Sequence, residues 1–122
     1  MDYLQIKSID EKVVMFRTHE DVVSVRGSLY EAARKWWNIS LGHAKRADYV
    51  FAVIDGVVRE VYEIIGAHSE MDDGSAYPHF DTARLVFDFS LAPDIIRKKY
   101  KDKILPPEYQ KWGQNPVRFT FK

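Results

Sequence analysis

The feature that most constrains the fold is the stretch 49–65, which reads YVFAVIDGVVREVYEII. Its first six residues are all apolar, which is typical of a strand covered on both faces. Asp55-Gly56 follows, and both residues tolerate the positive φ angles of a two-residue type I′ turn. A second run of β-branched residues resumes at Val57. The stretch therefore predicts a β-hairpin.

A two-residue turn also predicts the register of the hairpin. The predicted cross-strand pairs are Ile54 with Val57, Ala52 with Arg59, Phe51 with Glu60 and Tyr49 with Tyr62. Arg59 would then lie among apolar neighbours, where an unpaired guanidinium is costly. Its partner is expected to be either an internal carboxylate or an anionic ligand, since the guanidinium fork can bind two phosphate oxygens at once.

A helix is predicted just before the hairpin. Ser28 and Glu31 form a capping box, and one helical face carries Leu29, Ala32, Ala33 and Trp36. Helical neighbours differ by about 100°, so Trp36 is expected in the core, whereas Trp37 shares a stripe with Tyr30 and Arg34. Trp37 either stacks on a flat ligand or packs beneath a loop or the C-terminal segment. Ser40 is expected to cap a second, shorter helix that ends near residue 47.

The rest of the chain alternates between predicted strands, loops and a helix. Strands are expected at 13–18, 84–89 and 117–121, loops at 19–27 and 66–82, and a helix from Pro93 to about residue 101. This order predicts one α+β domain over residues 1–122. Its sheet is expected to be small, five-stranded, mixed or antiparallel, and strongly curled. A half-open barrel flanked by helices would close most of the sheet edges.

Composition narrows the class of partner. The 18 basic and 18 acidic residues give a formal net charge of zero, which argues against a protein that grips long duplexes by neutralising phosphates. The absence of cysteine excludes disulfides and thiolate metal sites. The N-terminal residues are polar, and no apolar run approaches the roughly 20 residues of a membrane span. We therefore expect a cytoplasmic protein without a membrane partner.

Two further segments contain side chains that could bind a ligand or a metal. In Gln114-Asn115-Pro116 the amides could read the polar edge of a base, or Asn115 could cap a turn while Pro116 orients the last strand. The loop 66–82 contains two histidines and four carboxylates (His68, Glu70, Asp72, Asp73, His79, Asp81), but their spacing matches no established metal site. No metal, cofactor or catalytic residue is predicted. The basic run Arg97–Lys103 is expected to be the solvated side of an amphipathic helix.

Three stretches together resemble a known family. LYEAARKWWNIS (29–40), YVFAVIDGVVREVYEI (49–64) and QNPVRF (114–119) resemble short, mostly uncharacterised bacterial and phage proteins with an LYEATRG-aromatic-W helix, an AVxxGxVREVY hairpin and a QNPIRY end. The order of elements is similar to small PUA-like barrels, which include ASCH and EVE domains and bind RNA or modified bases between barrel and helices. The matching positions implied by the resemblance are Arg34, Trp37, Arg59, Gln114, Asn115 and Arg118.

These observations predict a non-enzymatic binding module for a nucleotide-type ligand, which is a modified base, RNA or a small nucleotide signal. The ligand would lie between the first helix and the sheet, and nucleic acid would be short or single-stranded. Trp37 or Tyr30 would stack on it, the phosphates would meet Arg34 and Arg59, and the amides of Gln114 and Asn115 would contact its polar edge.

Three alternatives remain open on the sequence. One is a phage protein that sequesters a nucleotide immune signal. Another is a small metal-dependent nuclease or nucleotide hydrolase that uses residues 68–81. The third is a protein-interaction domain, with association of further copies of the chain as one form of it.

Overall fold

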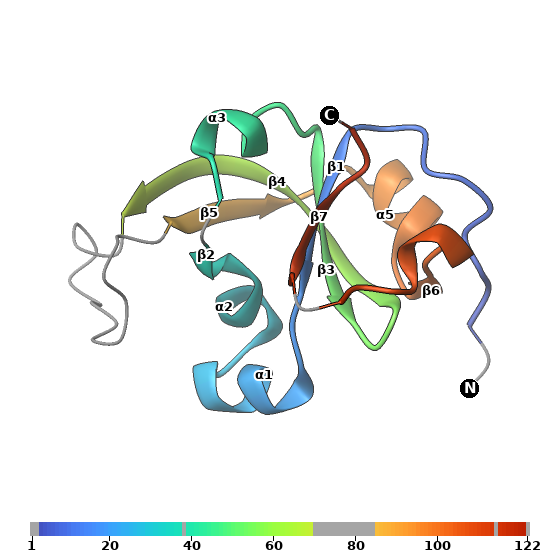
Figure 1. Ribbon diagram of the computed structural model, residues 1–122, viewed down its shortest axis with the longest axis horizontal. Coiled ribbons are helices and arrows are strands. Elements are labelled where there is room, and N and C mark those ends of the chain that lie inside the picture. Colours follow the sequence, from blue (N-terminus) through green and yellow to red (C-terminus); the bar gives the residue numbers. More distant parts are fainter. Residues whose placement is uncertain (1–2, 38, 70–84, 114, 122) are drawn as a thin grey trace.

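The computed structural model describes residues 3–37, 39–69, 85–113 and 115–121, and it shows an α+β fold around one mixed sheet (Figure 1). The strand order is β2-β5-β4-β3-β1-β7, and the short β6 pairs with β4. In chain order the elements are β1 (Val13–Arg17), α1 (Glu20–Arg26), α2 (Leu29–Arg34), β2 (Lys35–Trp37), α3 (Leu41–Ala44), β3 (Tyr49–Ile54), β4 (Val57–Ser69), β5 (Leu85–Leu91), α5 (Asp94–Tyr100), β6 (Lys103–Ile104), the 3-10 helix η1 (Pro107–Tyr109) and β7 (Val117–Phe119).

The sheet is open. Among the described residues β2 pairs with β5 at one end of the sheet and β7 pairs with β1 at the other. Only the β1–β3 pair is parallel within this set. The sheet also contains β2 and β6, which the five-strand prediction lacked, and the strong curl of a half-open barrel is not found.

The hairpin prediction is confirmed at its turn and wrong in its outer register. Asp55 and Gly56 have φ angles of 52° and 78°, and Ile54 pairs with Val57 as expected. The register then shifts, so that Ala52 faces Glu60 and not Arg59. The predicted pairs beyond this point are replaced by Phe51 with Val61 and Val50 with Tyr62. Arg59 is the extra residue of a β-bulge, which turns the strand locally and re-aims a side chain.

The first predicted helix is real but shorter than expected. The Ser28 hydroxyl accepts a hydrogen bond from the Glu31 N–H at 3.1 Å, as the capping box predicts. The helix ends at Arg34, and Trp37 belongs to a strand that pairs with β5. Tryptophan favours strands, and in β2 this preference and the pairing outweigh the helical periodicity. The second helix, capped by Ser40, also ends early, at Ala44.

Helix α1 (Glu20–Arg26) occupies most of residues 19–27, so the prediction of a loop there is wrong. Acidic Glu20 and Asp21 occupy the first turn of α1 and Arg26 its last turn, which suits the helix dipole. Gly27 closes the helix in the left-handed conformation, with φ of 92°. These start and stop signals were present in the sequence.

Two apolar clusters cover the two faces of the sheet. Alternate residues of β1 face opposite ways, so Phe16 packs with α2 and with Phe87, whereas Met15 packs with Tyr100 of α5. The expected helix after Pro93 is confirmed, with Tyr100 fully buried. None of the helices in the described part of the chain is long and apolar enough to cross a bilayer.

Candidate functional site

Trp37 lies in the core. Its side chain is 8% exposed and its ring stacks on Phe16, with centroids 4.6 Å apart and planes inclined by 9°. The indole N–H donates to the Ala33 carbonyl at 2.7 Å, which satisfies one of the last carbonyls of α2. The indole faces inward because β2 is a strand, so the expectation that Trp37 stacks on a ligand is wrong.

Arg34 and Tyr30 fill the space between α2 and the sheet. Arg34 pairs with Asp88 at 2.7 Å and with Glu31 at 3.0 Å, and it donates to the Phe87 carbonyl at 2.9 Å. Burial by itself lowers the pKa of Arg34, but the hydrogen bonds to these carboxylates outweigh burial and raise it. The Tyr30 hydroxyl accepts from the Phe89 N–H at 3.2 Å. The predicted cleft between the first helix and the sheet is therefore occupied by the protein's own side chains.

A carboxylate on α1, away from Arg34, neutralises Arg59. Its Nη1 lies 2.6 Å from Glu20 Oε1. The internal carboxylate, which was one of the two expected partners, is therefore the one observed, and it comes from α1. Arg34 contacts β5 and Arg59 contacts α1, so the structure does not bring these two predicted phosphate ligands to one site.

Two of the predicted residues do meet, at the open edge of β7. A hollow of about 360 Å³ lies there, and we call it the β7-edge hollow. Asn115 and Arg118 are among its lining residues, while Gln114 lies outside the described residues. Asn115 Oδ1 accepts from the Val117 N–H at 3.0 Å, which confirms its role in capping the turn before the strand. The full lining is Ile39, Lys111, Trp112, Asn115, Val117, Arg118 and Phe119.

Two arginines flank the indole of Trp112. The guanidinium carbon lies 5.5 Å from the ring centroid for Arg17 and 5.7 Å for Arg118, and Arg118 also lies 5.1 Å from the ring of Tyr109. Both guanidinium groups donate to carbonyl oxygens, Arg118 to Lys111 at 2.8 Å and Arg17 to Gly113 at 3.4 Å. No carboxylate in the described chain pairs with either arginine, so their charges are not neutralised there.

Unused hydrogen-bond donors lie around the same indole. Trp112 Nε1 and Arg17 Nε are buried and have no partner among the described atoms. The strand edge adds another donor. Thr120 N–H donates to Val13 and Arg17 N–H to Pro116, and in an antiparallel ladder this alternation directs the Phe119 N–H away from β1. The hollow thus combines positive charge with an aromatic surface, and unpartnered donors are buried beside it.

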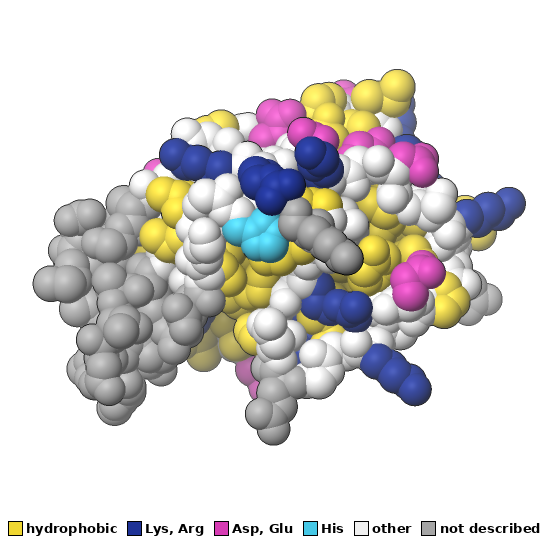
Figure 2. Space-filling model, turned by 45° about the horizontal axis from the view of Figure 1, so that its top comes forward, with side chains coloured by type: hydrophobic (Ala, Val, Ile, Leu, Met, Phe, Trp, Pro, Cys, Tyr) yellow, Lys and Arg dark blue, Asp and Glu magenta, His cyan; other side chains and the backbone are white. Residues whose placement is uncertain are grey.

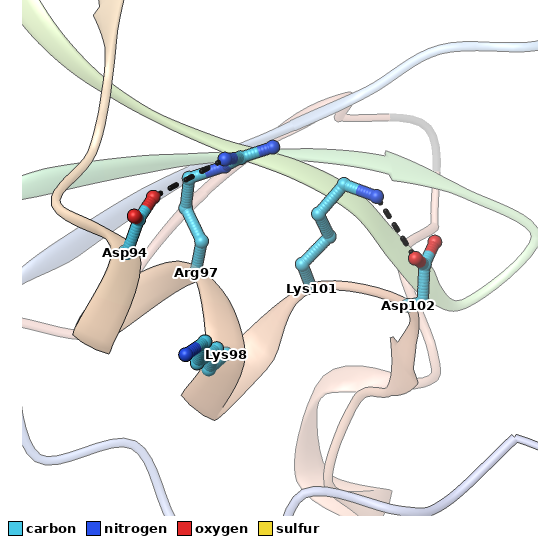
Figure 3. Close-up of a pocket in the computed structure, with 5 residues that line it drawn as sticks. All are labelled: Asp94, Arg97, Lys98, Lys101 and Asp102. Carbon is cyan, nitrogen blue, oxygen red and sulfur yellow. Dashed lines mark hydrogen bonds and ion pairs between the residues drawn. The ribbon is translucent and has the colours of Figure 1, made fainter.

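A second pocket beside α5 has a different electrostatic character. It measures about 390 Å³ and is lined by Asp94, Arg97, Lys98, Lys101 and Asp102 (Figure 3). Arg97 holds both oxygens of Glu60, at 2.9 and 3.0 Å, and Lys101 pairs with Asp102 at 2.9 Å. The protein's own carboxylates already satisfy these two cations, so this pocket is a weaker candidate for an anion.

The described residues hold no group of three histidine, aspartate or glutamate side chains that could bind a metal. The expected loop from residue 66 begins later, because β4 continues to Ser69. Its carboxylates and His79 lie outside the described residues. The metal-dependent alternative therefore stays a prediction.

Sequence reasoning missed Lys111 and Trp112, which line the hollow, and also Arg17 and Tyr109, which contact Trp112 and Arg118 beside it. A usable signal was present, since Lys111 and Trp112 stand just before the predicted amide segment. Arg17 carries no such signal, because only the pairing of β1 with β7 brings it to the C-terminal segment. Comparisons of this chain with protein-family models, curated proteins and solved structures gave no match.

Proposed function

We propose that this protein is a non-enzymatic binding module that holds a nucleotide-type ligand in the β7-edge hollow. One observation carries the proposal: Arg17 and Arg118 surround an indole without a carboxylate partner in the described chain. Carboxylates neutralise Arg34, Arg59 and Arg97 elsewhere. Cations that the fold leaves uncompensated are available to an anion.

The chemistry of the lining favours a phosphate attached to a flat group. Arginine can bind two phosphate oxygens through parallel N–H bonds, and Lys111 adds a further positive charge at the rim. Trp112 and Phe119 offer aromatic surface to a base. The volume lies at the lower end of the roughly 300–1,000 Å³ of small-molecule sites, which suits a nucleotide better than an inorganic ion alone.

The amide segment keeps its predicted role in this proposal. Asn115 Oδ1 is engaged by the backbone, so its NH₂ group is the part that can contact the polar edge of a base. The resemblance to PUA-like domains supports the same ligand class, although the observed sheet is open. RNA handling and sequestration of a nucleotide signal both need such a site, and they differ in which ligand binds most tightly.

Binding of nucleoside monophosphates and short oligonucleotides to Arg118→Gln, measured by isothermal titration, tests the proposal. We expect a loss of about tenfold or more in affinity, which is about 1.4 kcal/mol, because a charge-assisted hydrogen bond is lost. Arg59→Gln is the matched control, since Arg59 is already paired with Glu20, and it should change affinity less than twofold. Equal binding by wild type, Arg118→Gln and Trp112→Ala would refute the site.

A further inference from the structure

A third arginine, like Arg17 and Arg118, lies near an aromatic ring and has no carboxylate partner in the described chain. Arg46 follows α3, and no carboxylate of the described chain pairs with it. Its guanidinium carbon lies 5.5 Å from the ring centroid of Phe121. These three arginines therefore each approach an aromatic ring, and two of those rings, Trp112 and Phe121, lie in the C-terminal segment on either side of β7.

An aromatic cluster connects Arg46 with the β7-edge hollow. The His43 ring stacks on Phe119, with centroids 3.9 Å apart and planes inclined by 6°, and it meets the edge of Phe121 at 5.3 Å. Phe119 also lines the hollow. The aromatic surface thus continues from Trp112 past the strand edge to α3. Figure 2 shows basic side chains beside a histidine and adjoining hydrophobic side chains on the molecule's surface.

We propose that His43, Arg46 and Phe121 form a second subsite, so that the ligand is a single-stranded nucleic acid segment longer than one nucleotide. This inference rests on the proposed function of the β7-edge hollow. One phosphate would bind Arg118 while its base contacts Trp112, and the following nucleotide would bind on the α3 side with its phosphate at Arg46.

The two cations lie against different rings, which supports a chain over a mononucleotide. Arg46 approaches Phe121, which follows β7, and Arg118 approaches Trp112, which precedes β7. A ligand that meets both therefore extends past β7. Single strands suit a surface in which aromatic rings alternate with cations, because every base has a face that can stack. The zero net charge of the chain disfavours a long duplex.

The test is a length series of labelled oligonucleotides, from one to six residues of dT and of rU, measured by fluorescence anisotropy at several salt concentrations. We expect affinity to rise by about tenfold or more between one and three nucleotides, as an additional base stacks. Arg46→Gln should remove most of this gain and lower mononucleotide affinity far less than Arg118→Gln does. The slope of log affinity against log salt should fall in magnitude by about 0.7, as one phosphate contact is lost.

Arg46→Lys, which keeps the charge, should restore the salt slope, and Lys98→Gln on α5 serves as the charge-matched control. If mononucleotides bind and longer chains bind no better, the second subsite is refuted and the β7-edge hollow stands. If Arg46→Gln and wild type show the same length series, the second subsite is likewise refuted. If neither mononucleotides nor oligonucleotides bind, both the subsite and the proposed function are refuted.

Discussion

At the scale of single residues, what holds an arginine decides whether it can also bind a ligand. Arg34 and Arg97 each hold a carboxylate through short hydrogen bonds, at 2.7 and 2.9 Å. Arg118 is held by a carbonyl and by two aromatic rings. A carbonyl orients a guanidinium without cancelling its charge, so Arg118 is positioned and still attracts anions.

The distance along the chain between partners explains which of these roles could be predicted. Arg34 meets Asp88, 54 residues later, and Arg59 meets Glu20, 39 residues earlier. No local pattern reports such pairs, because the strand order creates them. The sequence did indicate that Arg59 needs a partner, since its neighbours are apolar, but it could not choose between a carboxylate and a ligand.

Trp37→Phe separates the core role of this residue from a binding role. Phenylalanine keeps the stacking on Phe16 but loses the hydrogen bond to the Ala33 carbonyl. We expect the free energy of unfolding to fall by about 1–3 kcal/mol, because a buried acceptor loses its partner and some volume is lost. Urea denaturation measures this change. A loss of nucleotide affinity without a loss of stability would contradict the core assignment.

At the scale of elements, local chemistry identified where several helices and turns begin and where chain direction reverses. The caps at Ser28 and Ser40 and the turn at Asp55-Gly56 are all found in the structure. What failed was the extent of some elements. The helix from Leu29 stops at Arg34 because the next residues pair with β5, and the hairpin register shifts at a bulge. Both outcomes depend on neighbours that are distant in the sequence.

The β3–β4 turn provides a prediction at this scale. Gly56 has φ of 78°, a conformation that costs other residues roughly 1–2 kcal/mol. A Cβ at Gly56 would also collide with the side chain of Gln110, which donates to the Leu105 carbonyl at 2.8 Å. We expect Gly56→Ala to lower the free energy of unfolding by about 1–3 kcal/mol.

Gly42→Ala is the matched control for Gly56→Ala. Gly42 lies in α3, and a Cβ there would meet no atom closer than the Ser40 hydroxyl at 3.8 Å. Alanine in a helix is favoured over glycine, so Gly42→Ala should leave stability unchanged or slightly higher. Equal effects of the two substitutions in thermal denaturation would contradict the argument from φ.

At the scale of the whole molecule, the segment before β1 contacts both α5 and the residue after β7. Glu11 accepts a short hydrogen bond from the Tyr100 hydroxyl and pairs with Lys99 at 3.1 Å, which joins the segment before β1 to α5. Thr120 donates to the Glu11 carbonyl at 3.2 Å and accepts from the Val13 N–H at 2.9 Å. The β7-edge hollow depends on this junction, because β7 can present Arg118 and Phe119 only while it stays paired with β1.

This junction predicts a dependence of stability on pH. Burial raises the pKa of Glu11, but hydrogen bonds from Tyr100 and Lys99 outweigh it, and the net pKa lies below the ordinary value of 4.5. A carboxyl whose pKa is lower in the folded state contributes stability above its unfolded pKa, and the contribution is lost as pH falls through the folded pKa. Glu11→Gln should therefore lower stability near pH 7, and its difference from wild type should shrink as the pH falls below about 4.5.

Urea denaturation of wild type, Glu11→Gln and Tyr100→Phe from pH 7 to pH 3 distinguishes this linkage from a simple packing effect. Tyr100→Phe removes the donor and keeps the ring, which packs on Phe51 with centroids 5.1 Å apart. It should reduce the same pH-dependent component, because the Glu11 carboxyl then keeps only Lys99 as its partner and its pKa lies closer to the ordinary value. A stability difference between Glu11→Gln and wild type that stays constant across this range would show that Glu11 stabilises the junction without a change in its protonation. Because the Glu11 pKa is lower in the folded state, the stability difference between wild type and Glu11→Gln must become smaller as the pH falls. Protonation removes the charged hydrogen bonds of Glu11 in wild type, whereas the glutamine variant has no such bonds to lose.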